Sequence, residues 1–479
     1  MKQTKIIATV GPATDSSEKL AALYDGGVSI LRFNFSHAKH DTVREILGRV
    51  RELNASGRTR LSTLLDTKGP EIRTGDVAEK RIYKKGDEFR FYVEPGAAEA
   101  DPTGLFCDYP YLVEDLNVGE TVRVDSGLLD VTVVGKSPNA LIVRAENDAT
   151  IGSRRHVNLP GVRIRLPGVT DQDREDIVFG MGEGMDFIAM SFVRTAANVL
   201  ELRELLAEHG ASHVKIIAKI ENQEGLENLD PIIEVADGIM VARGDLGIEV
   251  AIENLPFHQK EMVKKCRLAG KFVIVATHML ETMIENPFPT RAEVSDIFNA
   301  VAQRTDATML SGETTTGKYP LESVAMMRKV IESAESHFVS EHDDYSETGL
   351  TRRDIEKKTL IKNALYAAED LGCEAILVFT KSGRLARLAA AYRPNIPVFA
   401  CTNVERTVAY MNVLFGIEPV LLTSWSANDE ENLINGIKAL VGQGKISSGG
   451  RVVAVTDIVR GGKQIPVLEI LDLADLGIG

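Results

Sequence analysis

The sequence predicts an α/β protein built on a parallel eight-stranded barrel, with an all-β lid inserted into the barrel and a separate α/β domain after it. Three patterns predict this architecture. Short apolar runs alternate with stretches of helical periodicity, a block of alternating short strands interrupts them, and a polar segment precedes a second α/β pattern. A chain of 479 residues is also too long for one compact core.

Eight apolar runs, punctuated by Gly, Pro, Asn or Asp, are the expected barrel strands. They cover residues 4–11, 29–35, 61–67, 185–192, 214–220, 238–244, 271–277 and 307–312. Nearly continuous apolar strands are typical of parallel sheets covered by helices. Eight of them predict a closed (β/α)8 TIM barrel, whose active site lies at the carboxyl ends of the strands. We assign residues 1–69 and 168–340 to this catalytic barrel.

The barrel pattern is interrupted from about Pro70 to about Pro167. Breaker-rich sequences, Gly69-Pro70 and HVNLPGVRIRLPG, bound this segment. Between them stand EFRFYV, TVRVDS, DVTVV and LIVRAE, short runs typical of strands. We assign residues 70–167 to a β-barrel lid, which follows the third barrel strand and therefore lies over the barrel mouth.

A third domain is expected after the polar segment EHDDYSETGLTRRD. The α/β pattern restarts there, with strands predicted at AILVFT (375–380), PVFACT (397–402), PVLL (419–422) and RVVAVT (451–456). We assign residues 341–479 to a C-terminal α/β domain.

Charge and cysteine content limit the possible partners and the compartment. A formal net charge of -14 argues against binding to nucleic acid or to an anionic membrane, because both require a basic surface. The apolar run IIATV is shorter than a signal-peptide core, and no run approaches the ~18 residues of a membrane span. The four cysteines have neither metal-ligand nor disulfide spacing. We therefore expect reduced thiols and a cytoplasmic protein.

Polar residues gather at the carboxyl ends of the expected barrel strands. They are Arg32, Asn34, Ser36, Asp66, Lys219, Glu221, Arg243, Asp245, Thr277, Ser311 and Glu313. Side chains alternate along a strand, so Lys219 and Glu221 face the same side. An isolated pair of this kind is most often solvated on the surface. The run VKIIAKIEN is otherwise apolar, however, and a buried charge pair is costly unless it serves a metal or a charged ligand, so we interpret the pair as part of a site.

The residue types at this rim indicate phosphoryl transfer. Glu221 and Asp245 offer hard oxygen ligands to Mg²⁺, which takes one or two carboxylates together with substrate and water oxygens. Lys219 and Arg32 add the positive charge that neutralises a moving phosphoryl group. The turn ARGDLG could hold a carboxylate through its N–H groups, although a plain turn is the simpler reading of that sequence alone.

Seven motifs together resemble pyruvate kinase. They are RFNFSH (32–37), LLDTKGPEIRTG (64–75), VNLPG (157–161), KIENQEG (219–225), MVARGDLG (240–247), NPFPTRAEVSD (286–296) and MLSGETTTGKYP (309–320), in family order and with family-like spacing. The resemblance covers the barrel and lid and, more weakly, the C-terminal domain. It implies transfer of the phosphoryl group of phosphoenolpyruvate to ADP in glycolysis. It also implies Mg²⁺ (or Mn²⁺) and K⁺ as cofactors and, commonly, a homotetramer.

By this resemblance, the rim residues take family roles. Lys219 and Arg32 contact the transferred phosphoryl group, Glu221 and Asp245 bind the divalent metal, and Thr277 lies beside the enolate carbon that is protonated. The other implied positions are a phosphate contact at Arg73; a substrate-carboxylate turn of Ala242, Arg243, Gly244 and Asp245; proton delivery at Ser311 and Glu313; a K⁺ site at Asn34, Ser36, Asp66 and Thr67; and nucleotide contacts at Asn34, His37 and Arg73.

The resemblance also implies a regulatory role for the C-terminal domain (341–479), with a phosphate-binding effector loop, TKSGR. Its residues are Thr380, Lys381, Ser382, Gly383 and Arg384. Hydroxyls, a glycine and basic residues at a helix N-terminus suit a phosphate, although a simple turn capped by Ser382 explains the same sequence. Leu385 and the later segment DIVRGGKQIP (457–466), expected to be a loop, depart from members that bind fructose 1,6-bisphosphate. A sugar or nucleoside monophosphate is therefore the expected effector.

Three further positions bear on the family pattern. Ala38 replaces a usual Gly beside the cation and nucleotide sites, and His278 replaces a usual Gln; we expect His278 to pack rather than to transfer protons. Glu71 occupies a position that divides the family. K⁺-dependent members resemble this chain there, whereas K⁺-independent members carry Lys.

Two other functions fit part of the sequence. A metal-dependent aldolase or lyase on a similar barrel would also bind Mg²⁺ and a pyruvate enolate, but it would need neither the lid nor an ADP site. A catalytically silent relative could use the C-terminal domain to sense a metabolite. Formation of pyruvate from phosphoenolpyruvate, with and without ADP, distinguishes these possibilities from a kinase.

Overall fold

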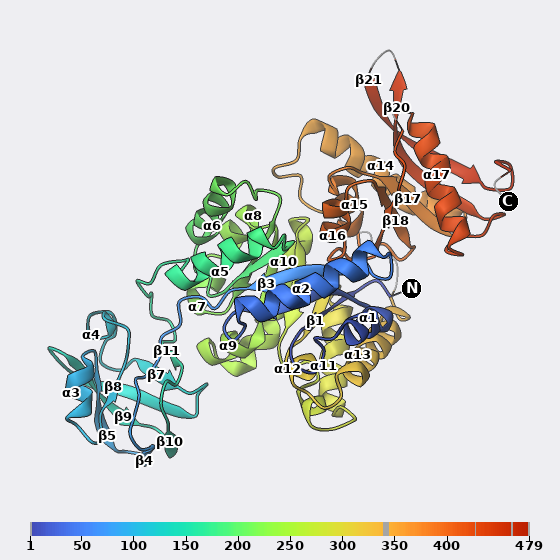
Figure 1. The fold of residues 1–479 in the computed structure, drawn as a ribbon. Helices are drawn as coiled ribbons and strands as arrows, with labels where there is room; N and C mark the ends of the chain where they lie inside the picture. The colour runs from blue at the N-terminus through green and yellow to red at the C-terminus, as the bar shows by residue number, and fades with distance from the viewer. Residues whose placement is uncertain (1, 339–343, 427, 461–462, 478–479) are drawn as a thin grey trace.

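The computed structural model describes residues 2–338, 344–426, 428–460 and 463–477. It contains a closed parallel barrel, a mostly β domain inserted into it and a C-terminal α/β domain (Figure 1). The predicted fold class is therefore confirmed. The domain boundary expected at residues 340 and 341 lies outside the described residues.

The barrel strands pair in the order β1-β16-β15-β14-β13-β12-β3-β2. They are β1 (Lys5–Thr9), β2 (Val28–Asn34), β3 (Ser62–Asp66), β12 (Phe187–Met190), β13 (Lys215–Ile220), β14 (Gly238–Ala242), β15 (Phe272–Ala276) and β16 (Ala307–Leu310). Each overlaps one of the predicted segments. The parallel register places Asn34 opposite Asp66 on β2 and β3, so their carboxyl ends share one rim.

Helices cover the outside of the barrel or follow the carboxyl ends of its strands (Figure 1). They are α1 (Ser17–Gly26), α2 (His40–Ala55), α5 (Asp171–Gly182), α6 (Ala196–Glu208), α7 (Gln223–Glu227), α8 (Leu229–Val235), α9 (Arg243–Glu249), η1 (Ile252–Asn254), α10 (Leu255–Leu268), η2 (Glu281–Ile284), α11 (Arg291–Ala302), α12 (Gly312–Thr315) and α13 (Pro320–Glu335). The sequence marks some of their starts chemically. In α5, Thr170 and Asp173 form a capping box, in which each side chain accepts the main-chain N–H of the other.

Apolar side chains fill the inside of the barrel. Ile7, Ile30, Leu64, Ile217 and Met240 are fully buried there, on alternate positions of their strands. The same apolar cluster continues without a break into the C-terminal domain, which therefore packs against the barrel as part of one core.

The inserted domain is mostly β, as predicted, and also contains two short helices that were not predicted. Its elements are β4 (Arg81–Tyr83), β5 (Glu88–Tyr92), α3 (Pro95–Glu99), β6 (Leu105–Phe106), α4 (Leu112–Asp115), β7 (Thr121–Val124), β8 (Leu129–Ser137), β9 (Ala140–Ala145), β10 (Ala149–Ile151) and β11 (Val157–Asn158). Six strands form one sheet, and β4 pairs with β10. The domain projects from the barrel (Figure 1), and Asn158 Nδ2 donates across the junction to Glu249 Oε1 at 2.8 Å.

The C-terminal domain is a five-stranded sheet in the order β19-β18-β17-β20-β21. Its elements are α14 (Arg352–Asp370), β17 (Ala375–Phe379), α15 (Arg384–Ala391), β18 (Val398–Thr402), α16 (Glu405–Met411), β19 (Ile417–Leu421), α17 (Asp429–Gly442), β20 (Arg451–Arg460) and β21 (Lys463–Asp472). The antiparallel strand β21 was not predicted. Segment 457–466, expected to be a loop, instead belongs to the hairpin of β20 and β21, apart from residues 461–462, which lie outside the described residues.

A buried ion pair joins the barrel to the C-terminal domain. The two oxygens of Asp306 accept from Nη1 and Nη2 of Arg393 at 2.8 and 2.5 Å. Asp306 also accepts the N–H groups of Val273 and Phe415, at 2.9 and 3.1 Å. The side chains of Asp306 and Arg393 are only 1% and 3% exposed. This pair therefore links β16 to the C-terminal domain away from solvent.

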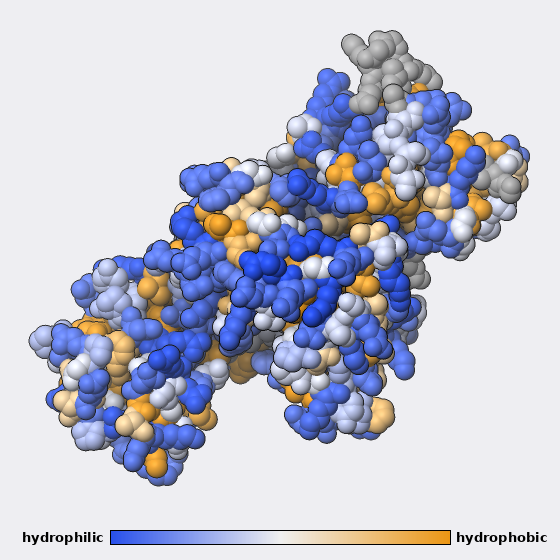
Figure 2. Space-filling view, viewed as in Figure 1, coloured by the Kyte–Doolittle hydropathy of each residue, from blue (hydrophilic) through white to orange (hydrophobic). Residues whose placement is uncertain are grey.

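The face of the molecule shown in Figure 2 is mostly hydrophilic over α2, with hydrophobic residues scattered elsewhere. Scattered apolar residues are normal on a protein surface. Within the described ranges, no helix combines the length and the apolar composition needed to cross a membrane. The four cysteines are buried free thiols.

Candidate active site

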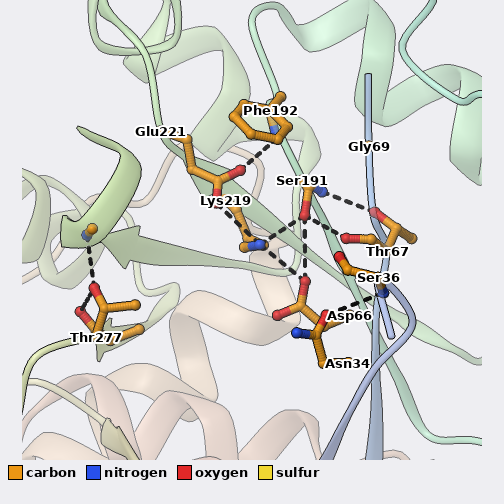
Figure 3. A network of polar contacts seen from close by, with 12 residues as sticks. Asn34, Ser36, Asp66, Thr67, Gly69, Ser191, Phe192, Lys219, Glu221 and Thr277 are labelled. Carbon is orange, nitrogen blue, oxygen red and sulfur yellow. Dashed lines mark hydrogen bonds and ion pairs between the residues drawn. The ribbon is translucent and has the colours of Figure 1, made fainter. Parts of the chain in front are cut away.

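The predicted rim residues converge at the carboxyl end of the barrel (Figure 3). Asp66 and Lys219 point toward each other from β3 and β13, and Ser191 joins them from the end of β12. Thr277, at the end of β15, lies on the other side of the same view. The barrel topology thus brings together residues that are far apart in the sequence.

Lys219 is the centre of this cluster. Its Nζ lies 2.9 Å from Asp66 Oδ1, 3.0 Å from Glu221 Oε1 and 2.7 Å from Ser191 Oγ. The side chains of Lys219 and Glu221 are 11% and 1% exposed. This burial excludes the alternative of a solvated surface pair.

Arg32 extends the buried cluster from β2. Its Nε donates to Asp66 Oδ2 at 2.6 Å, and its Nη1 donates to Thr9 Oγ1 at 3.0 Å. Asp66 therefore holds one cation on each carboxylate oxygen. Arg32 and Lys219 are fixed side by side, where both can contact one anionic group.

Burial and charge act in opposite directions on the pKa values of this cluster. Burial alone would lower the pKa of Lys219, but the carboxylates of Asp66 and Glu221 raise it above its ordinary value. Burial alone would raise the pKa of Asp66, but Arg32 and Lys219 lower it. For Glu221, burial outweighs the attraction of Lys219 and raises the pKa to about 7. The Glu221 carboxylate thus lacks full compensation by positive charge.

Glu221 and Asp245 fit a divalent metal for this reason. Glu221 Oε1 lies 3.0 Å from Lys219 Nζ at the end of β13, and Asp245 follows β14, the strand paired with β13, so both carboxylates lie on the same part of the rim. In the described part of the chain, no group of three or more His, Cys, Asp or Glu could hold a metal unaided. Two carboxylates completed by substrate and water oxygens are a usual arrangement for Mg²⁺.

Ser191 and Phe192 belong to the cluster but were not predicted. The Ser191 hydroxyl donates to the main-chain oxygen of Thr67 at 2.6 Å, and the Phe192 N–H donates to Glu221 Oε2 at 2.6 Å. Phe192 adopts a φ of 53°, a left-handed conformation that is rare for a bulky residue. Only their position in the sequence could have indicated these residues, because both stand at the end of the predicted strand MDFIAMSF.

The oxygens of the implied K⁺ site lie together at the ends of β2 and β3. Asn34 Oδ1 accepts the N–H of Ser36 at 3.2 Å, and Asn34 is opposite Asp66 in the register. The Thr67 oxygen available to an ion is its main-chain carbonyl, which Ser191 contacts. Carbonyl, hydroxyl and carboxylate oxygens suit K⁺, because such oxygens replace its hydration shell.

Arg243 and Thr277 tie together the ends of β14 and β15. The Thr277 hydroxyl accepts the N–H of Gly244 at 2.8 Å. The Arg243 guanidinium donates to the main-chain oxygen of Ala276 at 3.1 Å and pairs with Asp296 at 2.6 Å. Thr277 adopts a φ of 67°. The Arg243 side chain is thus occupied by bonds within the protein. A substrate contact of this residue would therefore be made by its main chain.

Ser311 and Glu313 follow β16. Glu313 is 1% exposed, and its two oxygens accept the N–H groups of Leu280 and Ser311 at 2.9 and 2.7 Å. Burial raises the pKa of Glu313. The buried hydroxyl of Ser311 has no hydrogen-bond partner among the residues that the structure describes. A substrate or a water molecule could therefore bind it.

Arg73 and His37 lie outside the Lys219 cluster. Arg73 Nη2 pairs with Glu71 at 2.6 Å, and its Nη1 donates to the main-chain oxygen of Arg154 at 2.9 Å, at the start of the lid. His37 is exposed after β2. Within the described ranges, neither residue makes a hydrogen bond or an ion pair with Lys219.

The structure shows the surroundings of the two positions, 38 and 278, at which the chain departs from the family pattern. Ala38 is half-buried against the barrel core. His278 is exposed, with a φ of 53°, so the expectation that it packs is wrong.

The TKSGR loop connects β17 to α15 and lines a cavity of about 580 Å³. The N-cap of α15 is Gly383, with a φ of 76°, and no side chain caps the helix. The alternative in which Ser382 caps the helix is therefore wrong. Arg384 pairs with Asp354 at 2.9 Å, and carboxylates share the cavity wall with the basic residues.

Comparisons with known proteins agree with this geometry. A family model described as pyruvate kinase, barrel domain, matches residues 1–324, and one described as pyruvate kinase, alpha/beta domain, matches residues 358–468. The chain is 40% identical to a pyruvate kinase of Geobacillus stearothermophilus, over 95% of this chain and 78% of that protein. It is 38% identical to one of Clostridium acetobutylicum, over 96% of both. A crystal structure of a pyruvate kinase from Cryptosporidium parvum is similar with a TM-score of 0.92 and 34% identity, covering 98% of this chain and 96% of that one.

Proposed function

The chain belongs to the pyruvate kinase family, and we propose that the buried cluster around Lys219 performs its phosphoryl transfer. As a pyruvate kinase, the protein moves the phosphoryl group of phosphoenolpyruvate to ADP, giving ATP and pyruvate in glycolysis. The observation that carries the assignment is the burial of Lys219 between Asp66 and Glu221. Such a charge cluster is costly to bury, and binding a charged ligand offsets that cost.

Lys219 and Arg32 would neutralise charge on the moving phosphoryl group. Both cations are held by Asp66, so they are oriented before substrate binds. Phosphoryl transfer depends mainly on positioning and on stabilisation of charge. Charges that need no reorganisation during the reaction lower its barrier most.

Glu221 and Asp245 would hold the divalent cation, Mg²⁺ or Mn²⁺. When bound, it supplies positive charge to the substrate oxygens. The turn from Ala242 to Asp245 would receive the substrate carboxylate through its N–H groups. Its position is fixed by the bond from the Gly244 N–H to Thr277.

Departure of the phosphoryl group leaves an enolate, which must take a proton at carbon. We assign proton delivery to Thr277, Ser311 and Glu313. The unpartnered hydroxyl of Ser311 supports this role, because it is free to bind a water or the substrate. The raised pKa of Glu313 favours a group that can carry a proton.

We place ADP between the barrel and the inserted domain, in contact with Asn34, His37 and Arg73. Residues 70–167 would then act as a lid that excludes water during transfer. Residues 1–69 and 168–340 would form the catalytic unit, and residues 341–479 the regulatory one.

The rate of pyruvate formation from phosphoenolpyruvate tests the assignment. We expect pyruvate only when both ADP and a divalent cation are present. Formation without ADP would indicate a lyase-like reaction. No formation under any of these conditions would indicate a catalytically silent protein.

We also propose that activity depends on K⁺, bound by Asn34, Ser36, Asp66 and Thr67. Replacing K⁺ by tetramethylammonium should lower kcat roughly 10²-fold, the scale of removing one stabilising charge contact. Glu71→Lys should weaken this requirement, because an ammonium group there can replace the ion. Glu71→Gln is the matched control: it also breaks the pair with Arg73 but adds no cation, so the K⁺ requirement should remain. Equal kcat of the original protein in both salts would contradict the proposal.

We further propose that a sugar or nucleoside monophosphate binds the TKSGR loop. Such an effector should shift the half-saturating phosphoenolpyruvate concentration by about 5-fold or more, a common scale for allosteric coupling. Glucose 6-phosphate, ribose 5-phosphate, AMP and fructose 1,6-bisphosphate would be compared. Ser382→Asp should abolish the shift, because its carboxylate repels a phosphate, whereas Ser382→Ala should preserve it. A response of Ser382→Asp like that of the original protein would place the effector elsewhere.

A homotetramer in the cytoplasm completes the proposal. The edge strand β21, which pairs on one side only with β20, and the exposed Phe257 and Phe288 of the barrel support association of several copies. Four buried free thiols are compatible with a reducing compartment.

A further inference from the structure

A second cavity lies at the opposite end of the barrel from Lys219. Its volume is about 940 Å³. This is the size of a small-molecule site, for which about 300–1,000 Å³ is typical. Lys215 begins β13 and Lys271 immediately precedes β15, so the barrel contributes its amino-terminal rim. Arg387 of α15 and Tyr410 of α16 line the same cavity from the C-terminal domain, which lies against this end of the barrel (Figure 1).

Lys271 and Arg387 are the two cations of this cavity without a carboxylate partner among the described residues. Lys271 Nζ donates to the main-chain oxygens of Glu234 and Ala236, at 3.1 and 2.6 Å. Arg387 Nη1 donates to the main-chain oxygen of Gly270 at 3.0 Å. Carbonyl oxygens satisfy hydrogen bonds but do not neutralise charge.

The two cations also lie close enough to repel each other. Burial lowers the pKa of Lys271, and the positive charge of Arg387 lowers it further, against the opposing effect of Asp237. Asp237 is already shared with Arg203 and Lys215, at 3.0 and 3.6 Å. An anion between Lys271 and Arg387 would relieve this repulsion.

The wall as a whole carries an excess of positive charge. Its cationic side chains are Lys215, Lys265, Lys271, Arg384 and Arg387, and its carboxylates are Asp230, Glu234 and Asp237. The lining residues therefore carry two positive charges in excess, but Arg384 is paired with Asp354 outside this wall. The chain as a whole has a formal net charge of -14, so this concentration of cations is local.

Tyr410 gives the cavity an aromatic surface. Lys215 Nζ lies 4.9 Å from the centre of its ring. Burial raises the pKa of the Tyr410 phenol, so the group stays protonated and can donate. Its hydroxyl makes no hydrogen bond within the described ranges. A ring with a free donor suits the organic part of a ligand.

We propose that this interdomain cavity binds a small phosphate monoester, with its phosphate between Lys271 and Arg387 and its organic part against Tyr410. A phosphate monoester carries a charge of about -1.5 to -2 at neutral pH, which matches the two cations that have no carboxylate partner among the described residues, Lys271 and Arg387. The ligand would contact the barrel and the C-terminal domain together and would therefore stabilise their docking.

This site is separate from the proposed effector loop, although the two are neighbours. Ser382 and Arg384 line both cavities, whereas Lys381 lines only the cavity of the C-terminal domain, and Lys271 lines only the interdomain cavity. Variants of Lys271 and Lys381 therefore distinguish the two sites.

Isothermal titration calorimetry of the full chain with phenyl phosphate tests the proposal, with inorganic phosphate as the probe that lacks a ring. We expect tighter binding of phenyl phosphate, and a loss of affinity of about tenfold or more in the double variant Lys271→Met, Arg387→Met. Lys381→Met should leave unchanged the binding component that the double variant removes, because Lys381 does not line this cavity. Equal affinity of the double variant and the original protein, or an equal loss in Lys381→Met, would overturn the proposal.

Two charge-preserving variants distinguish a loss of ligand contacts from a failure to fold. Lys271→Arg and Arg387→Lys keep the charges and should retain most of the affinity. Tyr410→Leu removes the aromatic ring and should weaken phenyl phosphate more than inorganic phosphate. If the charge-preserving variants lose as much affinity as the double Met variant while their thermal unfolding is unchanged, the cations are not the ligands of the phosphate.

Discussion

Lys219→Met is expected to lower kcat for pyruvate formation by about 10³-fold or more, while the barrel stays folded. A charge that stabilises the transferring phosphoryl group is worth about 10³–10⁵ in kcat. Lys219 is held within 3.0 Å of both Asp66 and Glu221, so no mobile side chain can replace it. The loss should appear in kcat rather than in KM, because the charge matters most in the transition state.

Lys219→Met leaves the buried carboxylates of Asp66 and Glu221 without this cation, so the folding of the variant must be checked. Circular dichroism and thermal unfolding should be measured with Mg²⁺ present, since the metal can compensate Glu221 and Asp245. Lys264→Met, a change at an exposed lysine of α10, should leave kcat unchanged. A folded Lys219→Met variant that keeps most of the original kcat would show that Lys219 is not catalytic.

The barrel was predictable because its strands are buried on both faces. Each strand is therefore a nearly continuous apolar run, such as KFVIVAT around β15, and the sequence marks it directly. The edge strand β21 was missed because it pairs on one side only, with β20. Its sequence KQIPVLEILD contains Pro466 and charged residues, which an edge tolerates and a pattern search rejects. The helices α3 and α4 are too short to show a helical period.

The charged residues of the candidate site could be predicted from the sequence. Lys219, Glu221 and Asp66 are conspicuous in apolar strands, and the structure buries them together. Ser191 is neutral and small, so only its place after β12 could have indicated it. The left-handed backbone of Phe192 had no signal in its residue type, because such conformations in non-glycine residues are imposed by tertiary contacts.

Asp306→Ala is expected to destabilise the docking of the C-terminal domain by roughly 3–5 kcal/mol, the usual cost of removing one partner of a buried ion pair. It would leave Arg393, which is 3% exposed, as an uncompensated buried charge. It would also remove the acceptor of the Val273 and Phe415 N–H groups. The urea midpoint of the unfolding transition should fall, and a second transition should separate if the C-terminal domain unfolds first.

A double variant, Asp306→Ala with Arg393→Met, identifies the cause of this loss. Because neither partner is then a buried charge, the double variant should be more stable than Asp306→Ala alone. Asp25→Ala is the matched control, since it breaks a carboxylate–arginine pair, Asp25 with Arg58, that is exposed to solvent, and it should hardly change the midpoint. If the effects of the two buried changes simply add, the pair is not coupled. The midpoint would then report lost packing at each position, and the attachment of the two domains would depend on the apolar cluster that runs between them.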